Sequence, residues 1–118
     1  MAKPAKHNIT IYQGATLRDM TTWKSGNPAT PVDLTGCTAR MQARAKITDT
    51  STLLSLTTEN GGIVLGGTAG TVAINMSASD TAAITWKSAV YDLEIVFADT
   101  TVRRLLAGSI SISPEVTR

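Results

Sequence analysis

Apolar and polar residues alternate most regularly near the end of the chain, from Tyr91 to Phe97. Every second residue there is apolar, and two of the residues between them are acidic. A period of two is typical of a half-buried strand, because successive side chains point to opposite faces of a sheet. The polar segment 98–100 separates this run from a second run rich in β-branched residues, 101–113. We therefore predict a β-hairpin over residues 91–113.

The second strand of this hairpin is less regular than the first. Residues of one parity are mostly apolar but include Arg104, which a continuous strand would place in the core. We predict a bulge near Ala107–Gly108, which shifts the register so that Leu105 faces inward instead. Opposite charges on the two strands also predict a cross-strand ion pair. Its candidate members are Asp92, Glu94, Arg103 and Arg104.

Shorter strand signals, separated by turn residues, occupy the earlier part of the chain. They recur about every 8–12 residues, the spacing of an all-β sandwich or barrel. In residues 15–24 the apolar positions are three apart, which suits a helical turn or a bulged strand, and the threonines there favour the strand. The predicted strands cover residues 9–12, 15–24, 37–45, 52–57, 63–65 and 71–76.

The run 37–45 is the most regular of these strands. Small or apolar side chains share one face, and polar or basic side chains share the other. The first face consists of Cys37, Ala39, Met41 and Ala43, and the second of Thr38, Arg40, Gln42 and Arg44. We expect the first face to pack in the core, and segments 9–11 and 37–43 to form the sheet that packs against the hairpin.

Residues 77–85 break the strand pattern. Ser77 or Ser79 is suited to cap a helix, and Asp80 lies in the first turn, where a negative charge suits the helix dipole. We predict one or two helical turns that cross from one sheet to the other. The whole pattern predicts an all-β, antiparallel β-sandwich of about 7–9 short strands. The sandwich covers residues 9–113, between an N-terminal arm, 1–8, and a C-terminal tail, 114–118.

Composition excludes several classes of protein and partner but does not identify a function. The 118 residues suit one domain, and a hydrophobic content of 42% excludes a disordered chain. The net charge of +2 is too small to indicate a nucleic-acid partner. The basic N-terminus is not followed by the apolar run of a signal peptide, and no apolar stretch has the length of a membrane span. We expect no nucleic-acid partner and no membrane contact.

Residues that carry catalysis or bind metals are scarce. His7 is the one histidine and has no partner motif, and Cys37, the one cysteine, is predicted to be a small buried thiol. Two such residues cannot form a four-ligand zinc site, and the acidic residues are too scattered for calcium. The glycine-rich segment 61–70 lacks the phosphate-loop pattern and predicts β-turns. We expect no cofactor, no metal, no small-molecule substrate and no enzymatic activity.

Several segments of the sequence together point to a known group of proteins. The first strand ends in QGAT, followed by TWK, by PVDLTG leading into ARMQAR, and by LLSLTTENGGI. The hairpin reads YDLEIVF and then VRRLLAGSISISPEVTR. Over residues 9–118 these segments resemble a group of small virion proteins of tailed bacteriophages. They also resemble, more loosely, the N-terminal domain of phage baseplate upper proteins, which has an immunoglobulin-like β-sandwich.

The resemblance implies a non-enzymatic structural protein of the virion, made in the host cytoplasm and immunoglobulin-like in fold. Such a protein is a small multi-copy adaptor or assembly module of the tail, baseplate or collar, and its partners are other virion proteins and copies of itself. One alternative is a capsid decoration (cement) protein. A second is a carbohydrate- or host-surface-binding module, for which Tyr12 is the plausible exposed aromatic residue.

We expect partner contacts at the arm, on one strand face and at the tail. Arg40, Arg44 and Lys46 line one side of their segment, but surfaces that bind nucleic acid usually carry more charge and more aromatic residues. A solvated or partner-facing strand explains these basic residues better. The candidate contact residues are Lys3, Lys6, His7, Arg40, Arg44, Pro114, Glu115 and Arg118.

Overall fold

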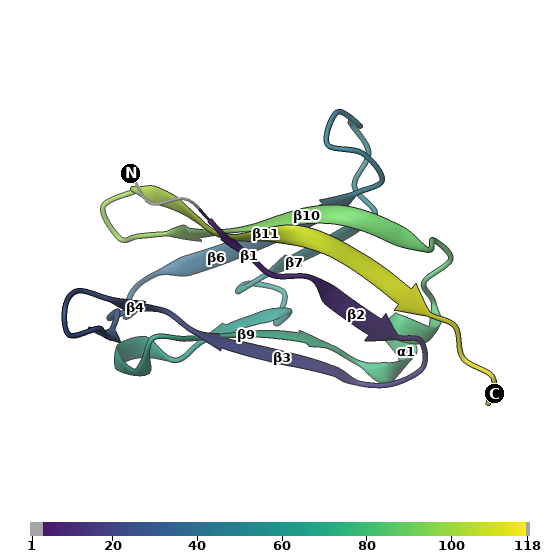
Figure 1. Ribbon diagram of the computed structural model, residues 1–118, viewed down its shortest axis with the longest axis horizontal. Coiled ribbons are helices and arrows are strands. Elements are labelled where there is room, and N and C mark those ends of the chain that lie inside the picture. Colours follow the sequence, from purple (N-terminus) through teal and green to yellow (C-terminus); the bar gives the residue numbers. More distant parts are fainter. Residues whose placement is uncertain (1–3, 118) are drawn as a thin grey trace.

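Strands make up most of the regular structure in the computed structural model, which describes residues 4–117. Within that range the chain forms eleven strands and one α-helix, α1 (Ala78–Ala82) (Figure 1). The strands are β1 (Ala5–Lys6), β2 (Ile9–Tyr12), β3 (Leu17–Thr22), β4 (Lys24–Ser25), β5 (Thr30–Pro31), β6 (Thr38–Arg44), β7 (Leu54–Thr57), β8 (Ile63–Leu65), β9 (Thr71–Met76), β10 (Ser88–Val96) and β11 (Val102–Ser113). The predicted β-rich chain with one short helix is confirmed. The predicted strand number is too low, because β1 and β5 lie in segments expected to be arm or loop, and β4 begins at the last residue of the strand predicted over residues 15–24.

The strands form two layers, visible above and below one another in Figure 1. The larger layer is a six-stranded sheet in the order β1-β11-β10-β6-β7, in which β2 also pairs with β11. The smaller layer has the order β3-β9-β8, and β4 pairs with β5 in a separate ribbon. The prediction of a purely antiparallel structure is wrong for the larger sheet. Both β1 and β2 run parallel to β11, so this sheet is mixed.

The hairpin of β10 and β11 is confirmed, but its bulge lies elsewhere. Leu93 pairs with Leu106, and the next pair is Glu94 with Arg104, so Leu105 has no partner on β10. The bulge therefore falls at Leu105 and not at Ala107–Gly108. The side chain of Leu105 is partly buried and packs against the core, so the prediction that it faces inward is confirmed.

The register shift also determines that the Arg104 side chain lies on the outer face of the sheet. Arg104 is exposed, and its Nε lies 3.4 Å from Oδ2 of Asp92. This is one of the predicted cross-strand pairs. Because both partners are about half exposed, such a pair contributes no more than about 1 kcal/mol.

One hydrophobic core fills the space between the two layers. Ala39, Met41 and Ala43 of β6 are almost completely buried, as their alternation predicted. The prediction that segments 9–11 and 37–43 form the opposing sheet is wrong. Both segments belong to the same sheet as the hairpin, because β2 pairs with β11 and β6 pairs with β10. The opposing side chains come from the smaller sheet, chiefly Ile63, Val72 and Ile74.

The helix α1 carries the chain from the smaller sheet to the larger one, as predicted. Oγ of Ser77 accepts a hydrogen bond from the Asp80 backbone N–H at 3.2 Å and caps the helix. Thr81 is completely buried, and its Oγ1 donates to the carbonyl of Ala15 at 2.9 Å and accepts from the Gly14 backbone N–H at 3.0 Å. These bonds fix the crossing helix to the corner between β2 and β3.

The segment expected to be an N-terminal arm belongs to the larger sheet over its described part. Ala5 and Lys6 pair in parallel with Leu106 and Ala107 of β11. The pairing is interrupted before β2, where Oδ1 of Asn8 accepts from the Ser109 backbone N–H at 3.1 Å. The arm assignment is therefore wrong for residues 5–8, because their backbone groups are used in the sheet; residues 1–3 lie outside the described range.

A methyl group at position 108 tests this close pairing. A Cβ on Gly108 would lie 2.4 Å from the His7 carbonyl oxygen and 2.8 Å from Oδ1 of Asn8. We expect Gly108→Ala to lower the free energy of unfolding by about 1–3 kcal/mol, the usual cost of overpacking. Urea denaturation followed by circular dichroism measures it. Ser111→Ala, at an exposed position of the same strand, is the control. Equal stability of the two variants would contradict the close approach.

Candidate interaction surfaces

The predicted contact residues do not gather in one place. Lys6 is exposed on β1, while His7 is half buried and faces into the molecule. Pro114 is exposed, whereas the Glu115 backbone N–H donates to Oε1 of Gln13 at 3.1 Å. The tail is thus held at its start by the corner after β2. Lys3 and Arg118 lie outside the described residues.

The basic residues of β6 lie on the outer face of the larger sheet, but their charges are already engaged. Nε of Arg40 lies 2.8 Å from Oε1 of Glu94 on the neighbouring strand. Arg44 donates through Nη1 to the carbonyls of Asp49 and Thr50, at 3.0 and 2.8 Å. Arg44 therefore supports the loop after its own strand. This face thus presents the Arg40–Glu94 ion pair and an Arg44 side chain bonded to backbone carbonyls.

His7 has a structural environment that the sequence did not indicate. Its Nε2 lies 2.8 Å from Oδ2 of Asp19, which faces inward from β3. The buried Tyr91 hydroxyl donates to the His7 carbonyl oxygen. Three polar groups from the first strands and from β10 thus meet between the layers. They attach the N-terminal strands to both sheets, which accounts for His7 better than a partner contact does.

The outer face of the smaller sheet is the least charged broad surface of the described chain. Met20, Ala73 and Val64 lie side by side in one row across β3, β9 and β8. Met20 is 68% exposed and Val64 is 54% exposed. The other outward residues of these strands are mostly small and polar, and one, Arg18, is charged: Arg18, Thr22, Thr71 and Asn75.

Sequence reasoning missed this face because it placed Met20 in phase with Leu17 and Trp23. The observed strand alternates without a bulge in this part, so Leu17, Asp19 and Thr21 point inward and Met20 points outward. The signal that would have found it is a strict period of two from Leu17. That reading puts the polar Asp19 inside, which the sequence alone does not favour.

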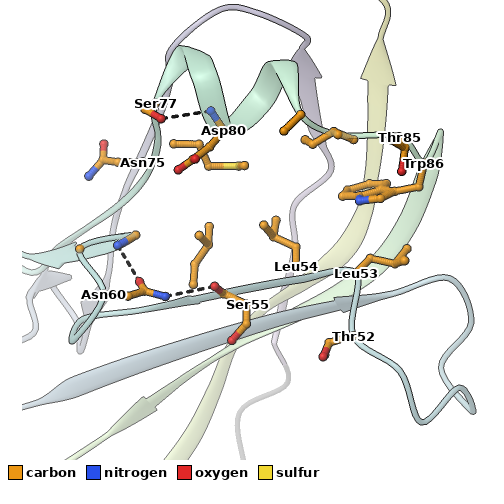
Figure 2. A pocket seen from close by; sticks show the side chains of 16 residues that line it. Thr52, Leu53, Leu54, Ser55, Asn60, Asn75, Ser77, Asp80, Thr85 and Trp86 are labelled. Carbon is orange, nitrogen blue, oxygen red and sulfur yellow. Dashed lines mark hydrogen bonds between the residues drawn. The ribbon is translucent and has the colours of Figure 1, made fainter.

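A cleft opens at one end of the molecule, between β7 of the larger sheet and the segment that contains α1 (Figure 2). Its volume is about 750 Å³. Apolar side chains, among them Leu54 and Met76, line part of it, and polar side chains surround them. Trp86 extends into the cleft from one end, and Asp80 points into it from the helix. The cleft brings together segments 52–62 and 75–86, and no pattern in the sequence indicates that these two segments meet.

Asn60 closes the edge of β7 that borders this cleft. Its Oδ1 accepts from the backbone N–H groups of Thr57 and Gly62, each at 2.9 Å, and its Nδ2 donates to the carbonyl of Ser55 at 3.1 Å. In an antiparallel edge strand, alternate residues point their backbone groups away from the sheet. The Asn60 amide therefore takes the position of a neighbouring strand. The predicted turn at residues 59–62 is confirmed, and its asparagine has this second role.

Residues 4–117 contain no group of three His, Cys, Asp or Glu side chains placed to hold a metal ion. Burial raises the pKa of the Cys37 thiol, with smaller contributions from Asp33 and Asp99, and this favours the unreactive protonated form. No helix in the described part of the chain is long and apolar enough to cross a membrane.

Comparison with known proteins adds no relative to these observations. No protein-family model matches the chain, and no curated protein matches it either.

The buried phenol of Tyr91 predicts a loss of stability at high pH. Burial raises its pKa well above the usual value, and the carboxylate of Asp19 adds to the rise. The folded state therefore holds this proton more tightly than the unfolded chain. The stabilisation is complete below about pH 10 and is lost as the pH rises above it. Between pH 8 and about pH 11, urea denaturation should show a larger loss for the wild type than for Tyr91→Phe.

Tyr12→Phe, at an exposed position, is the control and should follow the wild type. If Tyr91→Phe loses as much stability as the wild type over this pH range, the assignment of the phenol to a buried environment is wrong.

Removal of the Asn60 amide tests the closure of the β7 edge. Asn60→Ala loses three hydrogen bonds and leaves the outward groups of β7 open. We expect the free energy of unfolding to fall by about 1–3 kcal/mol, as measured by chemical denaturation. Asn75→Ala is the matched control, since the structure gives its side-chain amide no hydrogen bond within residues 4–117. A loss of the same size in both variants would speak against a special role for Asn60.

Proposed function

We propose that this chain is a non-enzymatic structural protein of a tailed-bacteriophage virion, a small multi-copy adaptor or assembly module of the tail, baseplate or collar. Two kinds of observation support the proposal. The first is the resemblance over residues 9–118, which is carried by turns and strand edges. The second is the character of the two outer sheet faces, and the face formed by Met20, Ala73 and Val64 carries the argument.

An interface needs a surface that loses its water at little cost. Burial of unpaired charges is expensive, whereas burial of methionine, valine, alanine and threonine is favourable or nearly neutral. The outer face of the smaller sheet meets this requirement, because Arg18 is its one charged residue among the outward positions of β3, β8 and β9. The outer face of the larger sheet instead carries the Arg40–Glu94 and Arg104–Asp92 pairs. We assign the partner-binding role to the smaller sheet.

We interpret the two layers as an immunoglobulin-like sandwich, as the resemblance implies. Support comes from the single core between two sheets and from α1, which crosses between them. In this interpretation, the parallel pairing of β1 and β2 with β11 is a local exception in an otherwise antiparallel sandwich. It brings the first and last strands of the domain side by side (Figure 1).

A capsid decoration protein would use the same kind of face, and copy number separates the two roles. A tail or baseplate adaptor is present in few copies per particle, and a decoration protein in many. Densitometry of purified particles, scaled to a capsid protein and to a tail protein, distinguishes them.

A charge placed on the proposed face should prevent assembly without unfolding the chain. Met20→Glu and Val64→Lys each add a charge at an exposed position, so the isolated domain should keep its circular dichroism spectrum and its melting temperature. We expect phage that rely on either variant to form particles that lack this protein, as measured by immunoblotting of purified particles.

Val90→Lys is the control, since Val90 is an exposed hydrophobic residue on the other sheet. Particles that contain the Met20→Glu and Val64→Lys variants at wild-type levels would refute the proposed face. A protein absent from particles altogether would refute the virion role.

A further inference from the structure

The cleft between β7 and α1 is not used by the proposed docking face, which lies on the outer side of the smaller sheet. Its volume of about 750 Å³ is within the range of pockets that hold small organic ligands. Two loops and the helix segment form its walls, and residues of both sheets form its floor (Figure 2). The chemistry of these walls identifies the class of ligand.

An extended peptide does not suit the cleft. A peptide that joined the edge of β7 would need the outward backbone groups of Ser55 and Thr57. Asn60 already bonds the Ser55 carbonyl and the Thr57 N–H. The Asn60 side chain therefore competes with a peptide for this edge, and the side chains of the cleft are the groups left open to a ligand of another kind.

The polar side chains of the cleft have unused hydrogen-bonding capacity. Asp80 is exposed, and within residues 4–117 the structure gives its carboxylate no hydrogen bond; the helix cap uses only its backbone N–H. In the same range the Asn75 amide and the Trp86 indole N–H have no partner either. Figure 2 shows Asp80 and Trp86 reaching into the same space. A carboxylate next to an aromatic ring can bond adjacent hydroxyl groups while the ring packs against a C–H face.

The charge of the cleft further restricts the class of ligand that it can bind. Asp80 is the one ionisable residue among the sixteen that line it, and no lysine, arginine or histidine is present there. A carboxylate without a basic partner repels acidic sugars and accepts hydrogen bonds from the hydroxyls of neutral ones. We propose that this cleft binds a neutral oligosaccharide, with a sugar ring packed on Trp86 and its hydroxyls bonded to Asp80.

This site differs from the one that the sequence suggested for carbohydrate. Tyr12 is 64% exposed, but it lies on β2 and is not among the residues that line the cleft. The inference stands apart from the virion assignment, since a sugar site and a docking face occupy different surfaces.

Nuclear magnetic resonance titration of the full chain tests the site directly. The two tryptophans give two indole N–H signals, one inside the cleft and one, Trp23, next to Phe97 at a distance of 6.0 Å between ring centroids. We expect maltotriose or chitotriose to shift the Trp86 signal and to leave the Trp23 signal in place. A glycan array that carries neutral and acidic glycans extends the search, and we expect it to show neutral binders.

Asp80→Ala separates specific binding from weak surface contact. Loss of a hydrogen bond to a charged group should weaken binding about tenfold, while the spectrum stays that of a folded protein. Asp49→Ala, at an exposed position outside the cleft, is the matched control and should bind like the wild type.

Three outcomes would overturn the proposal. The first is an absence of any Trp86 shift with both trisaccharides, together with an array free of neutral binders. The second is binding of acidic glycans alone. The third is undiminished binding by Asp80→Ala.

Discussion

The structure depends on the two-sided pairing of β11. Along one edge this strand is hydrogen-bonded to β10, and along the other it is paired in parallel with β1 and then with β2. The last strand of the domain is therefore paired along both of its edges, and β10 supplies only one of these two neighbours. The close approach at Gly108, where the chain passes from β1 to β2, is a direct consequence of this double pairing. Termini that are distant in sequence are thus joined by backbone hydrogen bonds.

Single side chains complete the parts that backbone pairing leaves open. Asn8 accepts the Ser109 N–H in the gap between β1 and β2, Asn60 takes the place of a strand beside β7, and Thr81 anchors α1 to the first corner. Each of them satisfies backbone groups that would otherwise stay without a partner in a small domain with many strand ends. No buried side-chain nitrogen or oxygen within residues 4–117 lacks a partner. Asparagine and threonine are frequent near these ends because their short polar groups reach the neighbouring backbone.

The division of surface character is what links this fold to an interaction role. Two ion pairs, Arg40–Glu94 and Arg104–Asp92, link neighbouring strands on the outer face of the larger sheet. Among the outward residues of the smaller sheet only Arg18 is charged, and the cleft at the end of the layers presents an aromatic ring beside unpaired polar groups. A molecule arranged in this way can dock through one surface and bind a small polar ligand at another.

The sequence by itself determined the alternation in residues 37–45 and 91–97, the hairpin, a helix cap at Ser77 or Ser79 and the turn at residues 59–62. These features depend on neighbours a few residues apart, so local alternation and turn chemistry reveal them. It also determined that Arg104 needed a bulge, although not that Leu105 forms it. Tertiary structure alone decided the rest. The parallel pairing of β2 with β11, the inward position of Asp19, the exposure of Met20 and the meeting of segments 52–62 and 75–86 all join residues far apart in the chain. Periodicity shows that a strand has two faces, but only the packing of the layers decides which face is buried.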